Sequence, residues 1–418
     1  MAAPQPVLTL PDARRIVAEH GFVPATPATS PARLGVEIEW HTVRIGEPDL
    51  PVPFELLEST ASAIHLPGGS RLTFEPGGQV ELSSQPLPGF ESGSAILADA
   101  RALASGLHEV GVGLVGLGLL PGATRDRALH SPRYDAMEAH FDAFGPAGRT
   151  MMRQTAAIQV NIDLGAEDAA PSRWQTTHAL GPLLAAVFAN SPFVASAPSG
   201  WYSNRLAVWL AIEGGRTAPV GSDGGAGSAW ADYSMRAPVM FIRASEDEYV
   251  PLRETLTFSD WIMGGHDLGW PTEEDLAYHL TTLFPPIRPR GWLELRMVDS
   301  LPSEWSIVPA IVAVALLEDS DASRRITPAL APLAGRWEDA ARHALHHPDF
   351  ARAAVECFAA AIDALPGLGA DRDAIDVVER YRDRYVSRER CPADDLIDTW
   401  RRTGRLVPDP EGTPTPAA

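Results

Sequence analysis

The sequence contains no lysine, and all 34 of its basic residues are arginine. This absence excludes Schiff-base catalysis, a P-loop lysine and a kinase-type strand lysine, because each of these requires a primary amine. Any phosphate chemistry must therefore use arginine, backbone N–H groups and metal ions. The net charge of −20 excludes a general polyanion-binding role, because such a field repels nucleic-acid phosphates and anionic lipid.

Cysteine and long apolar segments are also scarce. The two cysteines, Cys357 and Cys391, lack the spacing of metal ligands or of a catalytic pair. Residues 1–10 have no basic start followed by an apolar core, so the sequence predicts no signal peptide. The apolar run 111–120 is too short to cross a hydrocarbon layer of about 30 Å. Together these features predict a cytoplasmic protein that has no membrane partner.

The order of strand-like and helix-like segments predicts an α+β fold. Between residues 33 and 300, short β-like runs alternate with helices, whereas residues 304–405 carry helical patterns alone. We expect strands at 34–40, 72–74, 79–83, 113–120, 157–164, 239–242 and 293–298. We expect helices at 11–20, 95–110, 174–190, 306–318, 336–363, 370–388 and 393–403. The prediction is one catalytic domain over 1–405, with a linker at 24–31 and a disordered tail at 406–418.

Four expected strands place polar side chains at alternate positions, which lie on one face of a sheet. The opposite positions of these strands are mostly apolar. The polar sets are Glu37 and Glu39 in LGVEIEW, Gln79, Glu81 and Ser83 in GGQVELSS, Gln159, Asn161 and Asp163 in AAIQVNIDL, and Glu294 and Arg296 in WLELRMVD.

This pattern has two interpretations. A sheet with one solvated face also alternates polar and apolar residues. Glutamates on facing strands repel one another, however, and clustering them costs stability unless cations lie between them. A set of oxygen ligands without His or Cys suits Mg²⁺ or Mn²⁺ and disfavours zinc. We therefore favour a metal–phosphate site over a solvated sheet.

Arginines that could bind anions lie close to these strands in the sequence. Arg288 and Arg290 precede Arg296 in a proline-rich approach, FPPIRPRGWLELR, which restricts the backbone and lowers the entropy lost on clamping an anion. Arg205 and Arg216 lie farther upstream, in SNRLAVWLAIEGGRT. The glycine-rich segment 221–228 is a candidate cover for a site from which water must be excluded.

Six segments together resemble the motifs of the glutamate–cysteine ligase family, over roughly residues 33–300. They are GVEIEW, TFEPGGQVELSSQPL, MMRQTAAIQVNIDLG, SNRLAVWLAIEGGRT, YSMRAPVMFIR and HLTTLFPPIRPRGWLELRMVD. The likeness is greatest to the plant-like bacterial branch, which includes the ligase of ergothioneine biosynthesis. The resemblance implies a glutamine-synthetase-like fold, in which a curved antiparallel sheet forms a funnel flanked by helices.

The resemblance also implies roles for individual residues. The implied metal ligands are Glu37, Glu39, Glu81, Gln159 and Glu294, with Glu294 and Arg296 in catalysis. The implied ligands for ATP phosphates and substrate carboxylates are Arg205, Arg216, Arg288 and Arg290. The expected cofactor is Mg²⁺, with Mn²⁺ possible, and the expected substrates are ATP, glutamate and cysteine.

The expected reaction joins the γ-carboxylate of glutamate to the amine of cysteine through a γ-glutamyl phosphate. Two alternatives stay open at this point. The first is a ligase of the same fold that uses another amino acid or amine, or a guanidine-phosphorylating relative on the same sheet. The second is a nucleotide- or metal-binding regulator without turnover. The sequence leaves the oligomeric state open.

Overall fold

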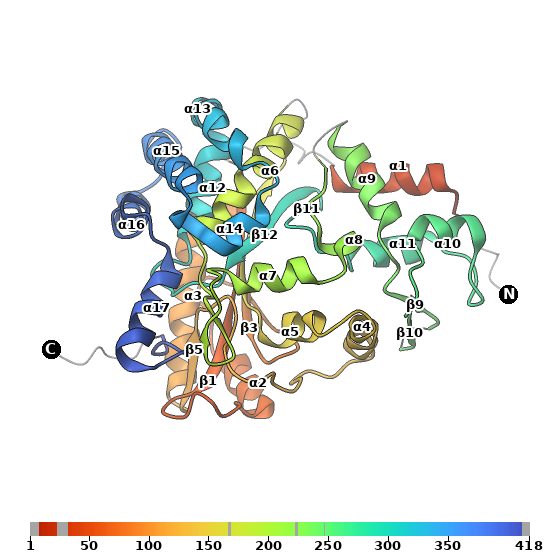
Figure 1. Cartoon of the computed structure of the whole chain (residues 1–418), viewed down its shortest axis with the longest axis horizontal. Helices are drawn as coiled ribbons and strands as arrows, with labels where there is room; N and C mark the ends of the chain where they lie inside the picture. The colour runs from red at the N-terminus through yellow and green to blue at the C-terminus, as the bar shows by residue number, and fades with distance from the viewer. Residues whose placement is uncertain (1–7, 23–31, 166–168, 222–224, 246, 412–418) are drawn as a thin grey trace.

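The computed structural model describes residues 8–22, 32–165, 169–221, 225–245 and 247–411. The expected linker at 24–31 lies outside these residues, as do 222–224 of the glycine-rich segment and 412–418 of the expected tail. Helices surround an antiparallel sheet (Figure 1), which confirms the predicted α+β class. Within the described ranges, no helix combines the length and the apolar character needed to span a bilayer.

The main sheet has the strand order β11-β12-β6-β1-β3-β2, and β4 and β5 also pair with β1. Its strands are β1 (Arg33–Arg44), β2 (Arg71–Phe74), β3 (Val80–Ser83), β4 (Leu87–Pro88), β5 (Val112–Val115), β6 (Ala157–Asp163), β11 (Ile287–Pro289) and β12 (Trp292–Asp299). Two hairpin-like sheets join β7 (Phe193–Val194) to β8 (Ala197–Pro198) and β9 (Phe241–Arg243) to β10 (Tyr249–Pro251). Because β1 pairs with four strands, its side chains meet those of most of the sheet.

The helices up to the last strand are α1 (Leu10–Gly21), α2 (Phe54–Ala63), α3 (Glu91–His108), α4 (Pro132–Asp142), α5 (Ala147–Gln154), α6 (Ala170–Val187), α7 (Asn204–Ala211), α8 (Gly214–Thr217), α9 (Ala226–Arg236), α10 (Phe258–Gly264) and α11 (Glu273–Leu280). The C-terminal helices are α12 (Val308–Glu318), α13 (Ser320–Leu330), α14 (Trp337–His343), α15 (Pro348–Ala364), α16 (Arg372–Arg384) and α17 (Pro392–Thr403). Side-chain caps fix several starts, as at α11, where Thr272 and Asp275 form a capping box.

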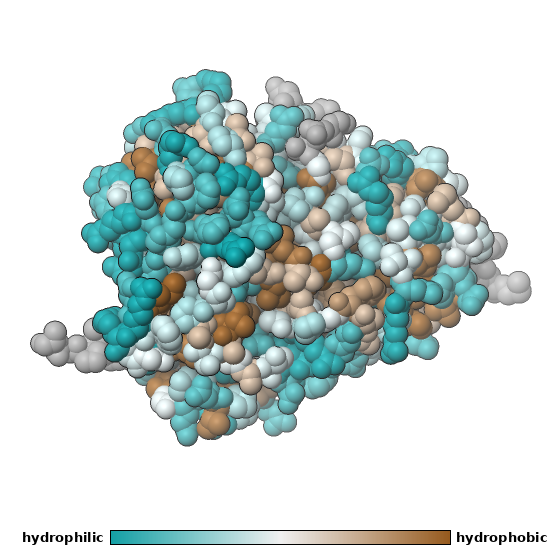
Figure 2. Space-filling model, in the orientation of Figure 1, coloured by the Kyte–Doolittle hydropathy of each residue, from teal (hydrophilic) through white to brown (hydrophobic). Residues whose placement is uncertain are grey.

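The apolar face of the sheet packs against helices. Val36, Ile38, Ile158 and Val160 are fully buried in a cluster that also contains α6 and α12 residues. Burying such a side chain stabilises the fold by about 1.5–3 kcal/mol. The outer surface of the C-terminal helices is mostly hydrophilic, at the left of Figure 2, while hydrophobic residues gather near the centre of that view. The helical layer therefore covers one face of the sheet and leaves the polar face on the other side.

Three expectations about elements need correction. The strand expected at 113–120 ends at Val115, because the chain beyond it turns close to another segment: a Cβ on Gly116 would lie 2.0 Å from the carbonyl oxygen of Leu301. The helix expected at 336–363 divides into α14 and α15, with Ala344 at a φ of 47° between them. Residues 226–228 of the glycine-rich segment form the first turn of α9.

The expected disordered tail packs against the body over residues 406–411. Val407 packs against a buried cluster that includes Val43 of β1 and Val115 of β5, and the carboxylate of Glu411 accepts a hydrogen bond of 2.9 Å from the backbone N–H of Ser303. Burial raises the pKa of Glu411 above its ordinary value. The tail prediction is therefore wrong for 406–411, while the division into a core at 33–300 and a helical layer at 304–405 stays a prediction.

Candidate active site

The register of the main sheet brings the polar side chains of four strands onto one face. Glu39 of β1 lies opposite Glu81 of β3, and Glu37 lies opposite Gln159 of β6. Glu294 of β12 lies opposite Asn161 of β6. All five predicted metal ligands therefore share this face, as the alternation in the sequence predicted.

Most of this face is shielded from solvent, although Glu37, Asn161 and Arg296 are only half-buried. The exposed fractions are 9% for Glu39, 7% for Glu81, 5% for Gln159 and 1% for Glu294. A solvated sheet face would expose its carboxylates, so the burial contradicts that alternative. Buried carboxylates on adjacent strands demand compensation by protons, cations or hydrogen bonds.

We call Glu37, Glu39, Glu75 and Glu81 the carboxylate side of the face. Burial, reinforced by the charge of Glu81, raises the pKa of both Glu37 and Glu39 from 4.5 to about 7. Burial and the charges of Glu39 and Glu81 raise the pKa of Glu75 well above its ordinary value. These carboxyl groups therefore favour protons when no other cation is present.

Hydrogen bonds orient the carboxylate side. Glu39 accepts bonds from the backbone N–H of Ala157 at 2.9 Å and from Gln159 Nε2 at 3.2 Å. The amide of Asn161 donates to Glu37 at 3.1 Å. The hydroxyl of Thr73 donates to Glu81 at 2.6 Å. These partners are neutral, so they position the carboxylates without balancing their charge.

We call Glu294, Arg288, Arg290 and Arg296 the arginine side of the same face. Arg288 donates to Glu294 through Nε at 2.5 Å and Nη2 at 3.0 Å. Guanidinium nitrogens of Arg296 and Arg290 lie 3.3 and 3.6 Å from the same carboxylate. Burial by itself would raise the pKa of Glu294, but Arg288, Arg296 and Arg290 outweigh it and lower the pKa to about 2. One carboxylate thus faces three cations, which leaves positive charge available to an anion.

Arg296 joins the two sides. Its guanidinium donates to the side-chain oxygen of Gln159 and also contacts Glu294. The rings of Trp209 on α7 and Phe284 lie 6.0 Å from it, so apolar surface flanks the charge. Burial opposes its charge, but Glu294, Glu37 and Glu39 outweigh this effect and raise the pKa of Arg296.

A β-bulge determines the direction of Arg296. Leu295 pairs with Val160 and Val298 pairs with Ile158, so two residues of β12 lie opposite Gln159 alone. The carbonyl of Arg296 accepts a hydrogen bond of 2.9 Å from Arg205 Nη2. Arg205 is 3% exposed and lies 3.9 Å from Asp299. The structure therefore places Arg205 at the backbone of β12, where its charge also acts on Glu39.

The structure does not bring Arg216 to the face. This arginine is fully buried and bonds to Glu213 at 3.1 Å, to the carbonyl of Thr282 at 2.8 Å and to that of Pro238 at 2.7 Å. Its guanidinium holds three separate segments together, and such bonding is typical of a structural arginine.

Sequence reasoning missed several residues of the site. Thr73 alternates with Leu72 on β2, so the period of that strand could have found it. Trp292 donates from its indole N–H to Asn161 at 2.8 Å and lies under the guanidinium of Arg290. Tyr134 on α4 has its pKa raised to about 12 by burial and by Glu75. No signal in the sequence links α4 to the sheet.

The oxygen atoms of the carboxylate side fit Mg²⁺. Among the residues that the structure describes, no three His, Cys, Asp or Glu side chains are grouped to hold a metal ion by themselves. Mg²⁺ in nucleotide sites usually takes one or two carboxylates and completes its shell with phosphate oxygens and water. Glu37 and Glu39, with pKa values near 7, gain stability from a nearby cation. The residues therefore fit a magnesium–phosphate site better than an all-protein cage.

The fold and this face define a class of protein. The solved structure of a glutamate–cysteine ligase from Francisella tularensis, in complex with AMP, has a TM-score of 0.56 to this chain. The match covers 90% of this chain and 86% of that one at 14% sequence identity, so it establishes a shared fold. The chain thus has the fold of this ligase class.

The sequence identifies the family. The family model described as "Glutamate-cysteine ligase family 2 (GCS2)" matches residues 33–410, so the chain belongs to that family. Glutamate–cysteine ligase EgtA of Mycolicibacterium smegmatis is 40% identical over 374 residues, which is 88% of this chain and 86% of that protein. The chloroplastic glutamate–cysteine ligase of Arabidopsis thaliana is 32% identical over 294 residues, covering 67% of this chain and 54% of that protein. The predicted recognition of the family, and of an enzyme of this family, is confirmed.

Proposed function

We propose that this enzyme joins the γ-carboxylate of glutamate to the amine of cysteine, with ATP as co-substrate and Mg²⁺ as cofactor. One observation carries the proposal: a single buried face combines carboxylates that demand a cation with arginines that can bind an anion. A magnesium–nucleotide complex would satisfy both demands at once, because the carboxylate side would hold the metal and the arginine side would bind the phosphates.

The residues of the carboxylate side would hold the metal. Glu37, Glu39, Glu81 and Gln159 supply oxygen atoms from adjacent strands. When bound there, Mg²⁺ supplies charge neutralisation for the phosphates of ATP. Glu294 was predicted as a further metal ligand, but its three arginine partners support a role in holding those guanidinium groups.

The arginine side would stabilise the first step. The γ-carboxylate of glutamate attacks the γ-phosphorus of ATP, forming a C–O–P bond and releasing ADP. Both reactants are anions, so stabilisation of the charge on the transferred phosphoryl group dominates this step. Arg296 is the guanidinium that contacts both sides of the face, which supports this role for it. Arg288 and Arg290 would bind the remaining oxygens.

The second step transfers the acyl group. The cysteine amine attacks the γ-carbonyl carbon, phosphate leaves, and the nitrogen releases a proton, giving γ-glutamylcysteine. Water must be kept from the acyl phosphate, and Trp209 and Phe284 provide apolar surface beside Arg296 for this purpose. No protein nucleophile is required, in agreement with the buried positions of both cysteines.

The similarity to EgtA supports a place in ergothioneine biosynthesis. We also propose a cytoplasmic location, because ATP and both amino acids are present there. We further propose that residues 1–405 act as one catalytic domain. The continuous hydrophobic cluster that joins the sheet to the C-terminal helices supports this proposal.

The test is product identification by mass after incubation with glutamate, cysteine, ATP and Mg²⁺, with ADP release measured in parallel. We expect γ-glutamylcysteine and an equal amount of ADP, both dependent on cysteine. ADP release that depends on another amine would assign a different acceptor on the same fold. Nucleotide binding without ADP release under any amino-acid pair would contradict the enzyme and favour a regulator.

A further inference from the structure

A second cavity lies on the helical side of the sheet, between α3, α16 and the start of α12. It encloses about 390 Å³ and shares no lining residue with the carboxylate or arginine side. Its floor is apolar and includes Leu97, Ile307, Ile311 and Val377. Gly93 allows the close approach that shapes this floor, because a Cβ at that position would lie 2.8 Å from Ile307. The volume is within the range of small-molecule sites.

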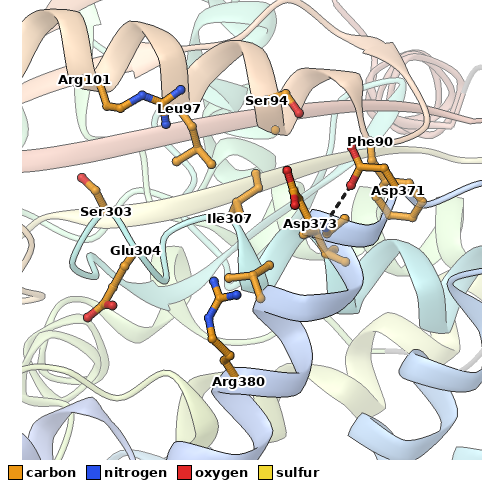
Figure 3. A pocket seen from close by; sticks show the side chains of 14 residues that line it. Phe90, Ser94, Leu97, Arg101, Ser303, Glu304, Ile307, Asp371, Asp373 and Arg380 are labelled. Atoms are coloured by element: carbon orange, nitrogen blue, oxygen red, sulfur yellow. Dashed lines mark hydrogen bonds between the residues drawn. The ribbon is translucent and has the colours of Figure 1, made fainter.

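The net charge of this cavity differs between its two ends. Arg101 and Arg380 lie to the left of Asp373 and Asp371 in Figure 3, and Glu304 lies on the side of the two arginines. Asp373 and Arg380 are seven residues apart on α16, which corresponds to about 10 Å along the helix axis. This separation keeps the two side chains from pairing with each other. The cavity therefore has one end with two aspartates and another end where two arginines outnumber one glutamate, across an apolar floor.

Three of these charged side chains have no other partner in the part of the chain that the structure describes. Among the described residues, the side chains of Arg101, Arg380 and Asp373 have no ion pair or hydrogen bond, whereas Asp371 caps α16 by accepting from the backbone N–H of Ala374 at 2.8 Å. Three acidic side chains, including Glu304, face two arginines, so the lining carries one net negative charge. This balance disfavours nucleotides and other polyanions, because they would add repulsion.

We propose that this cavity binds a short, extended peptide with free termini, of about three residues. An extended tripeptide spans roughly 10 Å, which matches the separation of the two ends. Its terminal carboxylate pairs with Arg101 and Arg380, and its terminal ammonium pairs with Asp373. An aliphatic side chain lies on the apolar floor between them.

The test is isothermal titration calorimetry of the full chain with the tripeptide Ala-Leu-Ala. The matched probe is the same peptide with an acetylated N-terminus and an amidated C-terminus, which keeps the shape and removes both charges. We expect at least tenfold weaker binding of the blocked peptide. No heat with the free peptide, or equal affinity for both peptides, would overturn the proposal.

Variants locate the binding. The double substitution R101Q/R380Q should weaken binding of the free peptide at least tenfold, and Asp373→Asn should weaken it several-fold. Arg372→Gln is the matched control, because Arg372 pairs with Asp376 at 2.7 Å outside the cavity. This variant should bind the free peptide with the affinity of the wild type. The three substituted residues, Arg101, Arg380 and Asp373, are exposed, so the variants should have the melting temperature of the wild type.

A competition experiment separates this cavity from the sheet site. Saturating ATP and Mg²⁺ should leave the affinity for Ala-Leu-Ala unchanged, because the cavity shares no lining residue with the carboxylate side or the arginine side. Displacement of the peptide by ATP would place the peptide at the carboxylate or arginine side of the sheet face and overturn the assignment. The result does not depend on the proposed ligase reaction, because no turnover is measured.

Discussion

The two sides of the polar sheet face contain glutamates of opposite character. Glu37 and Glu39 have pKa values near 7, whereas Glu294, on the same face of the same sheet, has a pKa of about 2. Burial acts in the same direction on all three. The difference comes from neighbours: Glu81 faces the first two, and three arginines face the third.

This difference indicates which ligand each side needs. A carboxylate with a raised pKa is short of positive charge, so the carboxylate side gains from a metal cation. The arginine side has more positive than negative charge, so it gains from an anion. A face built from carboxylates alone would bind metal without positioning a phosphoryl group. The carboxylate side and the arginine side together supply both kinds of group that the proposed magnesium–phosphate substrate needs.

The largest expected effect comes from Arg296→Lys, at the boundary between the two sides. Lysine keeps the charge but loses the planar fork that contacts Gln159 and Glu294. We expect kcat to fall by about 10³-fold, in the range of other arginines that stabilise phosphoryl transfer. Steady-state kinetics with ADP release as the readout measure this, and an unchanged kcat would assign Arg296 to structure.

The second effect concerns stability, and it should differ in sign between the two sides. Glu294→Gln leaves the buried guanidinium groups of Arg288 and Arg296 without a carboxylate, so we expect about 3–5 kcal/mol of destabilisation. Glu37→Gln removes a repelling charge, so the metal-free variant should be at least as stable as the wild type at pH 8. Urea unfolding measures both, and equal destabilisation would abolish the distinction between the sides.

The third effect is pH dependence without metal. The folded-state pKa of about 7 for Glu37 and Glu39 exceeds the ordinary 4.5, so the folded protein binds more protons than the unfolded chain between these values. Stability should therefore fall as pH rises from about 4.5 to about 7. Mg²⁺ affinity should rise over the same range, because binding displaces these protons. The contribution of Glu294 has the opposite sign, and it is lost as pH falls toward 2.

Melting temperatures with and without Mg²⁺ across this pH range test the third prediction. Glu37→Gln should flatten the metal-free profile and reduce the stabilisation by Mg²⁺. A metal-free stability that rises steadily from pH 4.5 to 7 would contradict the raised pKa values of the carboxylate side.

The smallest effect is expected for Arg290→Gln. This side chain is 48% exposed and lies 3.6 Å from Glu294, so its loss should cost under about 1 kcal/mol of stability. As an exposed cation at the edge of the arginine side, it should affect the binding of ATP more than the chemical step. We expect KM for ATP to rise several-fold with kcat nearly unchanged. A fall in kcat as large as the rise in KM would show that Arg290 acts in the chemical step.

Strand alternation predicted much of the site because the period of two depends on local geometry alone. It correctly placed Glu37 and Glu39 together on one face, and likewise Glu294 and Arg296. The expected disorder at 406–411 failed because composition does not reveal that Val407 and Glu411 contact the body. The roles of the individual residues stay predictions until the variants are measured.

The sequence by itself determined the family, the α+β class and which residues can supply oxygen ligands and guanidinium groups. These follow from residue identity and short-range periodicity. Tertiary structure alone decided that Glu294 faces three arginines, that Arg205 bonds the backbone of β12, and that Arg216 lies apart from the site. The reason is that charge balance in a buried site depends on contacts between residues distant in the chain, and a local pattern contains no information about them.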